Sequence, residues 1–296
     1  MANAISPIRR QQTKPYLTLD EFKNAPTALD YGNLVQGGSQ AAQDAELSNA
    51  ILRASSWIDQ HCDQILSATV DVEQQRGRIG TDGSVVFHPK YAPIVALTSL
   101  NIGFSPQAVV AVPDPSIAWI EEQQVIFPYA NANLSWSSAG PLGFGATGSS
   151  RARVYVNYTY INGYFNSTIV TATAGASTLT VADGTGLVVG DQFTIFDGTS
   201  TETVTVASTY TFGSATVPLT SALAFTHTAG VAASALPAAI KEACILVTSA
   251  YLKIRGDSSL ILGVTNAPGQ AVDGSQKIGT DIAHAQDLLK PFRRIR

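Results

Sequence analysis

Apolar residues recur at helical spacing in two long stretches of the chain. In 40–65 they lie four, three, four and seven residues apart, and in 237–255 four, three, four and three apart. This spacing gathers them on one face of each helix. Because each face needs a partner, we predict that the two helices pack on each other. The predicted helix-pair core consists of Leu47, Ile51, Ile58, Ile240, Val247 and Tyr251.

Two shorter helices are expected near the ends of the chain. Thr18 and Glu21 have the spacing of a capping box, which predicts a helix over 19–24. Thr280 can cap a last helix, which Pro291 should end near Lys290. The glycine-rich stretch 256–279 before this helix is expected to be a loop.

Alternation of apolar and polar positions predicts β-strands between the two long helices. The expected strands cover 68–76, 84–87, 95–102, 108–112, 117–127 and 151–160, and prolines separate several of them. The stretch 130–150 is rich in Gly, Ser and Ala and is expected to be an exposed loop.

A further segment, 166–234, differs from its surroundings in charge. It has no Lys or Arg between Asn166 and Ala233, and the charge of its Asp and Glu residues equals the net charge of −4 of the whole chain. Short alternating runs separated by Asp-Gly and Gly-Asp turns predict a small antiparallel β module. Closing edge strands are expected at 216–219, where an edge tolerates Pro218, and at 230–231. The acids are Asp183, Asp191, Asp197 and Glu202.

Together these patterns predict an α+β fold with a helical bundle core, an antiparallel β part and an inserted small all-β domain. The expected domains are an N-terminal part of the core at 1–165, the inserted β domain at 166–234, and C-terminal helices at 235–296.

Composition excludes several classes of protein. The chain has 296 residues with 18 Lys and Arg against 22 Asp and Glu, so it lacks the overall basic charge of a free nucleic-acid binder. No stretch approaches the ~20 apolar residues of a membrane span, and we expect a soluble protein made in the cytoplasm. Cys62 and Cys244 have no ligand partner at metal spacing, so we interpret them as small buried hydrophobes.

A search for catalytic chemistry finds no convergent motif. Glu121 and Glu122 are adjacent, and neighbours on a strand face opposite sides, so they are interpreted as solvated charges. Asp183, Asp191 and Asp197 suggest either a calcium site or turn-forming residues beside glycine, and turns are favoured. We therefore predict a protein that is not an enzyme and needs no metal or cofactor.

Two further groups of residues have alternative interpretations. The first is an aromatic run that forms either a stacking platform for bases or sugars or, as we favour, a sheet core. The second is a basic chain end at Lys290, Arg293, Arg294 and Arg296, which is either solvated or a site for phosphate or an acidic protein surface. The aromatic run consists of Tyr155, Tyr158, Tyr160, Tyr164 and Phe165.

The order of these elements resembles a known family. The segments 16–22, 50–59, 93–102 and 154–160, the helix after Pro237 and the ending Leu-Leu-Lys-Pro-Phe-Arg-Arg are similar to the head-to-tail adaptor, or connector, proteins of long-tailed bacteriophages. The likeness covers most of 15–165 and 236–296. The β unit 166–234 departs from the family pattern, and the resemblance implies nothing about its role.

The resemblance implies a virion protein at the head-tail junction, made in the host cytoplasm. Family members form a ring, usually dodecameric, that docks under the portal protein, meets downstream head-completion or tail proteins, and continues the channel through which double-stranded DNA passes without sequence recognition. Carried onto this chain, the portal-docking arm would consist of Leu288, Leu289, Phe292, Arg293, Arg294 and Arg296.

Two other functions remain open from the sequence. A tail or baseplate component would bind a host surface glycan through the β unit, using aromatics such as Phe193, Phe196 and Tyr210. A hydrolase would rest only on scattered Asp and Glu residues.

Overall fold

The computed structural model describes residues 14–27, 29, 32, 34–80, 84–121, 123–128, 153–255 and 274–294. The chain forms two compact units. Unit 1 consists of Met1–Ser67, Phe165–Gly184 and Val189–Arg296, and unit 2 of Ala68–Tyr164 and Thr185–Val188. The predicted boundaries at 165 and 235 stay predictions.

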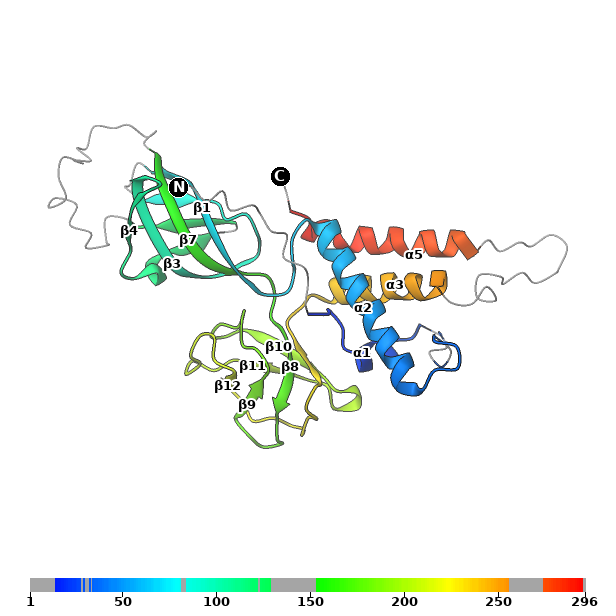
Figure 1. Ribbon diagram of the computed structural model, residues 1–296. Helices are drawn as coiled ribbons and strands as arrows, with labels where there is room; N and C mark the ends of the chain where they lie inside the picture. The colour runs from blue at the N-terminus through cyan, green and yellow to red at the C-terminus, as the bar shows by residue number, and fades with distance from the viewer. Residues whose placement is uncertain are drawn as a thin grey trace. The chain divides into compact units, whose positions relative to one another are not determined.

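The helices belong to unit 1. α1 (Leu19–Lys23) begins with the predicted capping box, in which Thr18 and Glu21 bond each other's backbone N–H. α2 (Gln40–Cys62) is capped by Ser39, and α3 (Ala238–Arg255) packs against both α2 and α5 (Gly274–Leu289) (Figure 1). α5 begins earlier than expected, inside the stretch predicted to be a loop, and a turn of 3-10 helix, η5 (Lys290–Phe292), follows it.

The second part of unit 1 is a six-stranded antiparallel sheet with the order β11-β10-β13-β8-β9-β12 (Figure 1). Pro218 lies on the edge strand β12, as predicted. The expected edge strand at 230–231 is wrong, because the strand forms one residue later, as β13 at Ala232–Ser234, and lies in the middle of the sheet. The strands are β8 (Asn166–Thr171), β9 (Thr178–Val181), β10 (Gln192–Phe196), β11 (Glu202–Thr205), β12 (Thr216–Pro218) and β13 (Ala232–Ser234), with a short 3-10 helix η4 (Gly198–Ser200).

The two ends of this sheet's sequence meet. Asn166, which begins β8, is the cross-strand partner of Ser234, which ends β13. The N–H of Ala235 donates to the carbonyl of Phe165 at 2.9 Å, so the pairing continues for one residue on each side. The chain therefore enters and leaves the sheet through two neighbouring strands.

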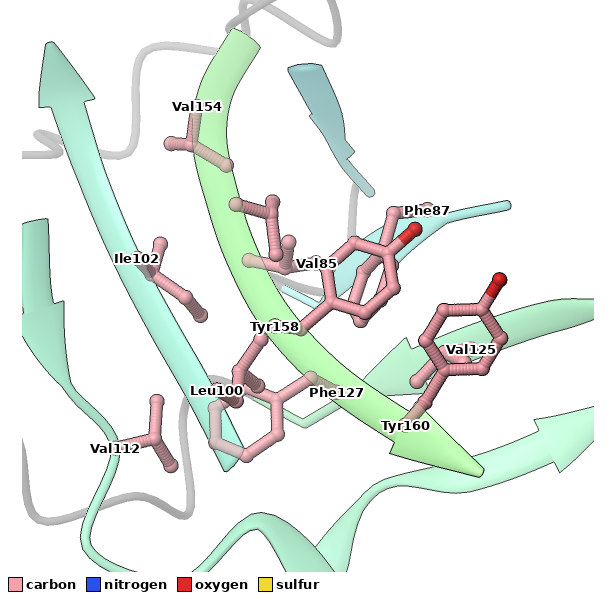
Figure 2. Close-up of a cluster of buried hydrophobic side chains, with 11 residues drawn as sticks. Val85, Phe87, Leu100, Ile102, Val112, Val125, Phe127, Val154, Tyr158 and Tyr160 are labelled. Carbon is pink, nitrogen blue, oxygen red and sulfur yellow. The ribbon is translucent and has the colours of Figure 1, made fainter. Parts of the chain in front are cut away.

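Unit 2 is built on a seven-stranded antiparallel sheet with the order β4-β3-β7-β1-β2-β6-β5. Along β1, half-buried and exposed residues alternate, which gives the sheet an inner and an outer face. Figure 2 shows Val154, Tyr158 and Tyr160 projecting from β7 into the core of the inner face. The elements are β1 (Thr69–Ile79), β2 (Val85–Phe87), β3 (Ile94–Ser105), β4 (Ala108–Ala111), η1 (Pro115–Ile117), β5 (Trp119–Glu121), β6 (Gln124–Phe127) and β7 (Arg153–Asn162).

The predicted fold class is wrong. The described chain is mostly β, with two curled antiparallel sheets and only a few helices, and no helical bundle forms its core. The physical reason lies in the strands, because each sheet buries its own apolar face. Leu100, Val156 and Phe127 form one such core in unit 2, and Ile195 and Val204 belong to another in unit 1. Within the described ranges, no helix has the length and apolar character needed to cross a membrane.

Candidate functional site

The C-terminal segment after α5 is held against the end of α2. The backbone N–H of Arg294 donates to the carbonyl of Cys62 at 3.0 Å, and the side-chain amide of Gln64 donates to the carbonyl of Phe292 at 2.8 Å. The guanidinium of Arg294 forms an ion pair with Asp63, with 3.2 Å between Nη2 and Oδ2. Cations at this place also suit the negative end of the α2 dipole. The turn formed by residues 290–294 is therefore fixed to the end of α2.

The predicted docking residues divide into two groups in this arrangement. Leu289 is fully buried, and Arg294 is largely covered by its ion pair. Arg293 is exposed, and Leu288 and Phe292 are half-buried. Arg296 lies outside the described residues. Lys290, which was predicted in the basic chain end but not in the docking arm, and Pro291 are also exposed. Lys290 forms an ion pair with exposed Asp287, with 2.8 Å between Nζ and Oδ1, so the outward surface combines apolar groups with Arg293 and this pair.

The C-terminal turns of α2 also carry a buried polar cluster. The hydroxyl of Tyr16 donates to Asp59 and accepts the N–H of Leu66 at 2.9 Å, while the N–H of Tyr16 donates to Ser55 Oγ at 3.0 Å. Burial raises the pKa of Asp59 to about 7, although the bonds from Tyr16 and Leu66 lower it. The other carboxylate oxygen of Asp59, Oδ2, is buried and makes no hydrogen bond among the described residues.

The two cysteines are buried, as their interpretation requires, and they do not form a disulfide. Burial raises the pKa of each thiol to about 12, for Cys62 and for Cys244. A thiol with so high a pKa holds little thiolate at neutral pH and is a poor nucleophile. The Sγ of Cys244 lies 3.7 Å from Ser55 Oγ, which places it in the contact between α2 and α3.

A buried ion pair joins α1, α3 and the six-stranded sheet. The ammonium of Lys241 donates to Glu21 Oε1, and the other oxygen of Glu21 accepts the N–H of Thr18 at 2.8 Å. Lys241 Nζ also lies 3.4 Å from the centroid of the Phe196 ring on β10. Nearby, Phe165 packs edge-on against Phe193, with 5.1 Å between ring centroids. These contacts fix the β module to the helices.

A second buried cluster lies within the β module. His227 has a fully buried side chain, with Nδ1 at 3.1 Å from Asp197 and Nε2 at 2.7 Å from Glu202. Burial works to raise the pKa of Glu202, but the N–H groups of Ala224 and Phe225 and the imidazole of His227 outweigh it and lower the pKa. No local sequence signal marks this cluster, because the histidine lies 25 and 30 residues from its partners.

A third cluster lies in unit 2 around one carboxylate. The hydroxyls of Tyr158 and Tyr160 donate to the two oxygens of Glu73 at 2.8 and 2.7 Å, and the N–H of Lys90 donates to Oε2 at 3.1 Å. Tyr158, Tyr160 and Phe165 are fully buried or nearly so. Three residues of the aromatic run therefore lie in cores, as favoured, whereas Tyr155 lies on the other face of the sheet beside Arg76 and Tyr164 is half-buried.

The other predicted residues are placed as follows. Leu47, Ile51, Ile58, Ile240 and Val247 are buried, and Tyr251 is half-buried, on helices that contact each other. Among the described residues no cluster of three His, Cys, Asp or Glu side chains is arranged to hold a metal ion.

The acids and aromatics of the β module also have structural places. Asp183 pairs with Lys14 and Asp197 with His227. The expectation of exposed aromatics for a glycan is wrong for Phe193 and Tyr210, which are buried, and Phe196 is half-buried beside Lys241.

Comparison with known proteins gives little further information. No protein-family model matches the chain, and no curated protein matches it either. A solved structure with some likeness to the chain is described as the neck of an empty GTA particle computed with C6 symmetry. The likeness covers 97% of this chain and 95% of that chain, at 12% sequence identity and a TM-score of 0.39. At this TM-score the likeness supports no conclusion about fold or function.

Proposed function

We propose that this chain is a structural, non-catalytic component of the neck of a phage-like particle. More specifically, it forms a head-to-tail adaptor ring beneath the portal protein and continues the DNA channel toward the tail. The sequence resemblance suggests this role, and the observation that carries it is the placement of the motif 288–294. That motif is fixed to the end of α2 and presents Lys290 and Arg293 outward.

The geometry divides the motif into anchoring and contacting residues. Leu289 is buried, and Arg294 bonds to Asp63 and to the Cys62 carbonyl, so these two hold the turn in place. Arg293 supplies exposed charge, Lys290 is exposed and paired with Asp287, and Phe292 adds apolar surface beside them. Arginine flanked by apolar and aromatic groups is typical of residues that dominate protein–protein contacts. The matching surface on the portal would be acidic with an apolar centre.

Assembly with the portal tests this proposal. The purified chain is examined by light scattering and negative-stain imaging, alone and with portal rings. We expect rings of the chain on the portal, and we expect the double variant Lys290→Gln with Arg293→Gln to lose them while keeping its melting temperature. Lys23→Gln with Arg53→Gln, which also removes two cations, is the matched control and should assemble normally.

Point variants are needed because deletion of the segment would not be a clean test. Ala285 and Leu289 are fully buried, so removal of 281–296 would expose the face of α3 beneath them. A chain that stays monomeric with the portal at high concentration would exclude the adaptor role. Rings that form equally well with the double variant would exclude only the docking patch.

A further inference from the structure

Two arginines lie directly opposite each other on the outer face of the seven-stranded sheet. The register of β1 and β7 pairs Arg78 with Arg153, and both residues are exposed. Directly opposite residues in an antiparallel pair project from the same face, with Cβ atoms about 5 Å apart. Like charges in this position are destabilising. The pair of Arg78 and Arg153 therefore lowers the stability of the isolated chain.

A third arginine extends the group. Arg76 is two residues along β1 from Arg78, so it projects from the same face, about 7 Å away along the strand. Its guanidinium donates to the hydroxyl of Tyr155 at 3.0 Å and lies 5.4 Å from the centroid of that ring. Tyr155 is the cross-strand partner of Arg76, so the aromatic ring orders one side of the group.

No carboxylate neutralises these arginines among the described residues. The two acids of β1, Asp71 and Glu73, project from the opposite face. There Asp71 accepts from Asn162 at 2.8 Å, and Glu73 accepts from the two core tyrosines. The strand thus separates its charges, with acids bonded on the inner side and cations exposed on the outer side.

We propose that the arginine face, defined as Arg76, Arg78 and Arg153, binds the phosphodiester backbone of double-stranded DNA. Guanidinium groups match phosphate oxygens in paired hydrogen bonds, and repeated phosphates would relieve the repulsion between Arg78 and Arg153. Along β1 and β7 the next residues on this face, Gln74 and Asn157, are polar, whereas Val86, the partner of Arg78 on β2, is apolar and half-buried.

This inference rests on the proposed function, since a DNA conduit brings duplex DNA to the protein. It adds the surface of the protein that contacts the DNA. Three contacts to phosphate and none to bases would give weak binding without sequence preference. Weak binding of this kind positions DNA without preventing its passage. The net charge of −4 of the whole chain offers no general attraction, so any measured binding reports a local surface.

The test measures binding of the full chain to a linear DNA duplex as a function of salt concentration. We expect binding at low salt that falls as salt rises. The double variant Arg78→Gln with Arg153→Gln should weaken it about tenfold and reduce the slope of log affinity against log salt by about 1.8, at about 0.9 for each phosphate contact. Its melting temperature should not fall, because a like-charge pair has been removed.

The control variant, Lys23→Gln with Arg53→Gln, changes the charge by the same amount on unit 1 and should bind DNA as the parent chain does. The inference fails if the parent chain does not bind DNA, or if both double variants bind alike. If the parent chain binds polyglutamate but not DNA, and the Arg78→Gln, Arg153→Gln variant no longer binds polyglutamate, the arginine face binds an acidic protein instead. Ring assembly on the portal, measured with the same variants, reports the proposed function separately.

Discussion

Lys241 Nζ lies over the ring of Phe196, 3.4 Å from its centroid, while the same ammonium bonds to Glu21. The side chains of Lys241 and Glu21 are only 10% and 9% exposed, so both charges have lost most of their water. Burial lowers the pKa of Lys241, and the attraction of Glu21 works against that change. One cation thereby holds together α1, α3 and the β module.

Lys241→Met should destabilise the protein by about 3 kcal/mol, because it leaves the Glu21 carboxylate buried without its cation. Urea denaturation measures the change. Glu21→Gln preserves the capping box, since glutamine also serves at that position. The double variant should cost clearly less than the sum of the two single variants. Additive costs would show that the two side chains do not interact.

Asp59 should make the protein less stable as pH rises from about 4 to about 7. Its pKa in the folded chain is about 7, whereas an unfolded Asp titrates near about 3.9. Between these values the folded state holds a proton that the unfolded state has lost, so the free energy of unfolding falls with increasing pH. Asp59→Asn cannot titrate and should remove this decline, by up to about 1.4 kcal/mol for each pH unit.

Urea unfolding at several pH values between 4 and 8 measures this effect as the difference between the parent chain and Asp59→Asn. Asp20→Asn, which changes an exposed carboxylate on α1, should keep the pH dependence of the parent. An Asp59→Asn variant with the same decline as the parent would show that Asp59 is ionised in the folded protein throughout this range.

Glu73→Gln should weaken unit 2, because the amide has one acceptor oxygen where the carboxylate offers one to each tyrosine hydroxyl. A buried hydroxyl without an acceptor costs about 1–3 kcal/mol. Burial first, and then Glu73, raise the pKa of Tyr158 and Tyr160 well above the usual value. The substitution removes the second cause, so these tyrosines should ionise at lower pH.

Near-ultraviolet absorbance during alkaline titration measures tyrosine ionisation, and thermal unfolding measures stability. Glu121→Gln changes an exposed carboxylate in the same unit and should affect neither. An unchanged tyrosine titration in Glu73→Gln would mean that the carboxylate does not interact with the two hydroxyls.

Local signals in the sequence were sufficient for part of this structure. The capping box of Thr18 and Glu21 and the apolar stripe of α2 depend on residues within a few turns of each other, so their elements form as predicted. Pro218 lies on an edge strand because proline has no N–H for a second neighbour. These features depend only on residues that are close together in the sequence.

Features that depend on distant pairing could not be predicted in this way. Glu73 and Tyr158 are 85 residues apart, and Glu21 and Lys241 are 220 apart. The strand β13, Ala232–Ser234, has no β-branched or aromatic residue and still lies between β10 and β8. Its own residues do not favour a strand, and it forms because the neighbouring strands β10 and β8 bond to its backbone. The bundle prediction failed for the same reason, since helical periodicity does not show how much core the sheets form.

Because Asn166 and Ser234 pair on neighbouring strands, the chain path would allow the β module to be removed. The contacts of the module with the rest of unit 1 would be lost, however, and stability would fall. A short turn from Phe165 to Ala235 could close the chain after excision of the module, because those two backbones already bond. Excision would, however, expose Phe165 and remove the ring that covers Lys241. A chain shortened in this way would therefore need compensating substitutions at Phe165 and Lys241, the two positions that lose an aromatic partner.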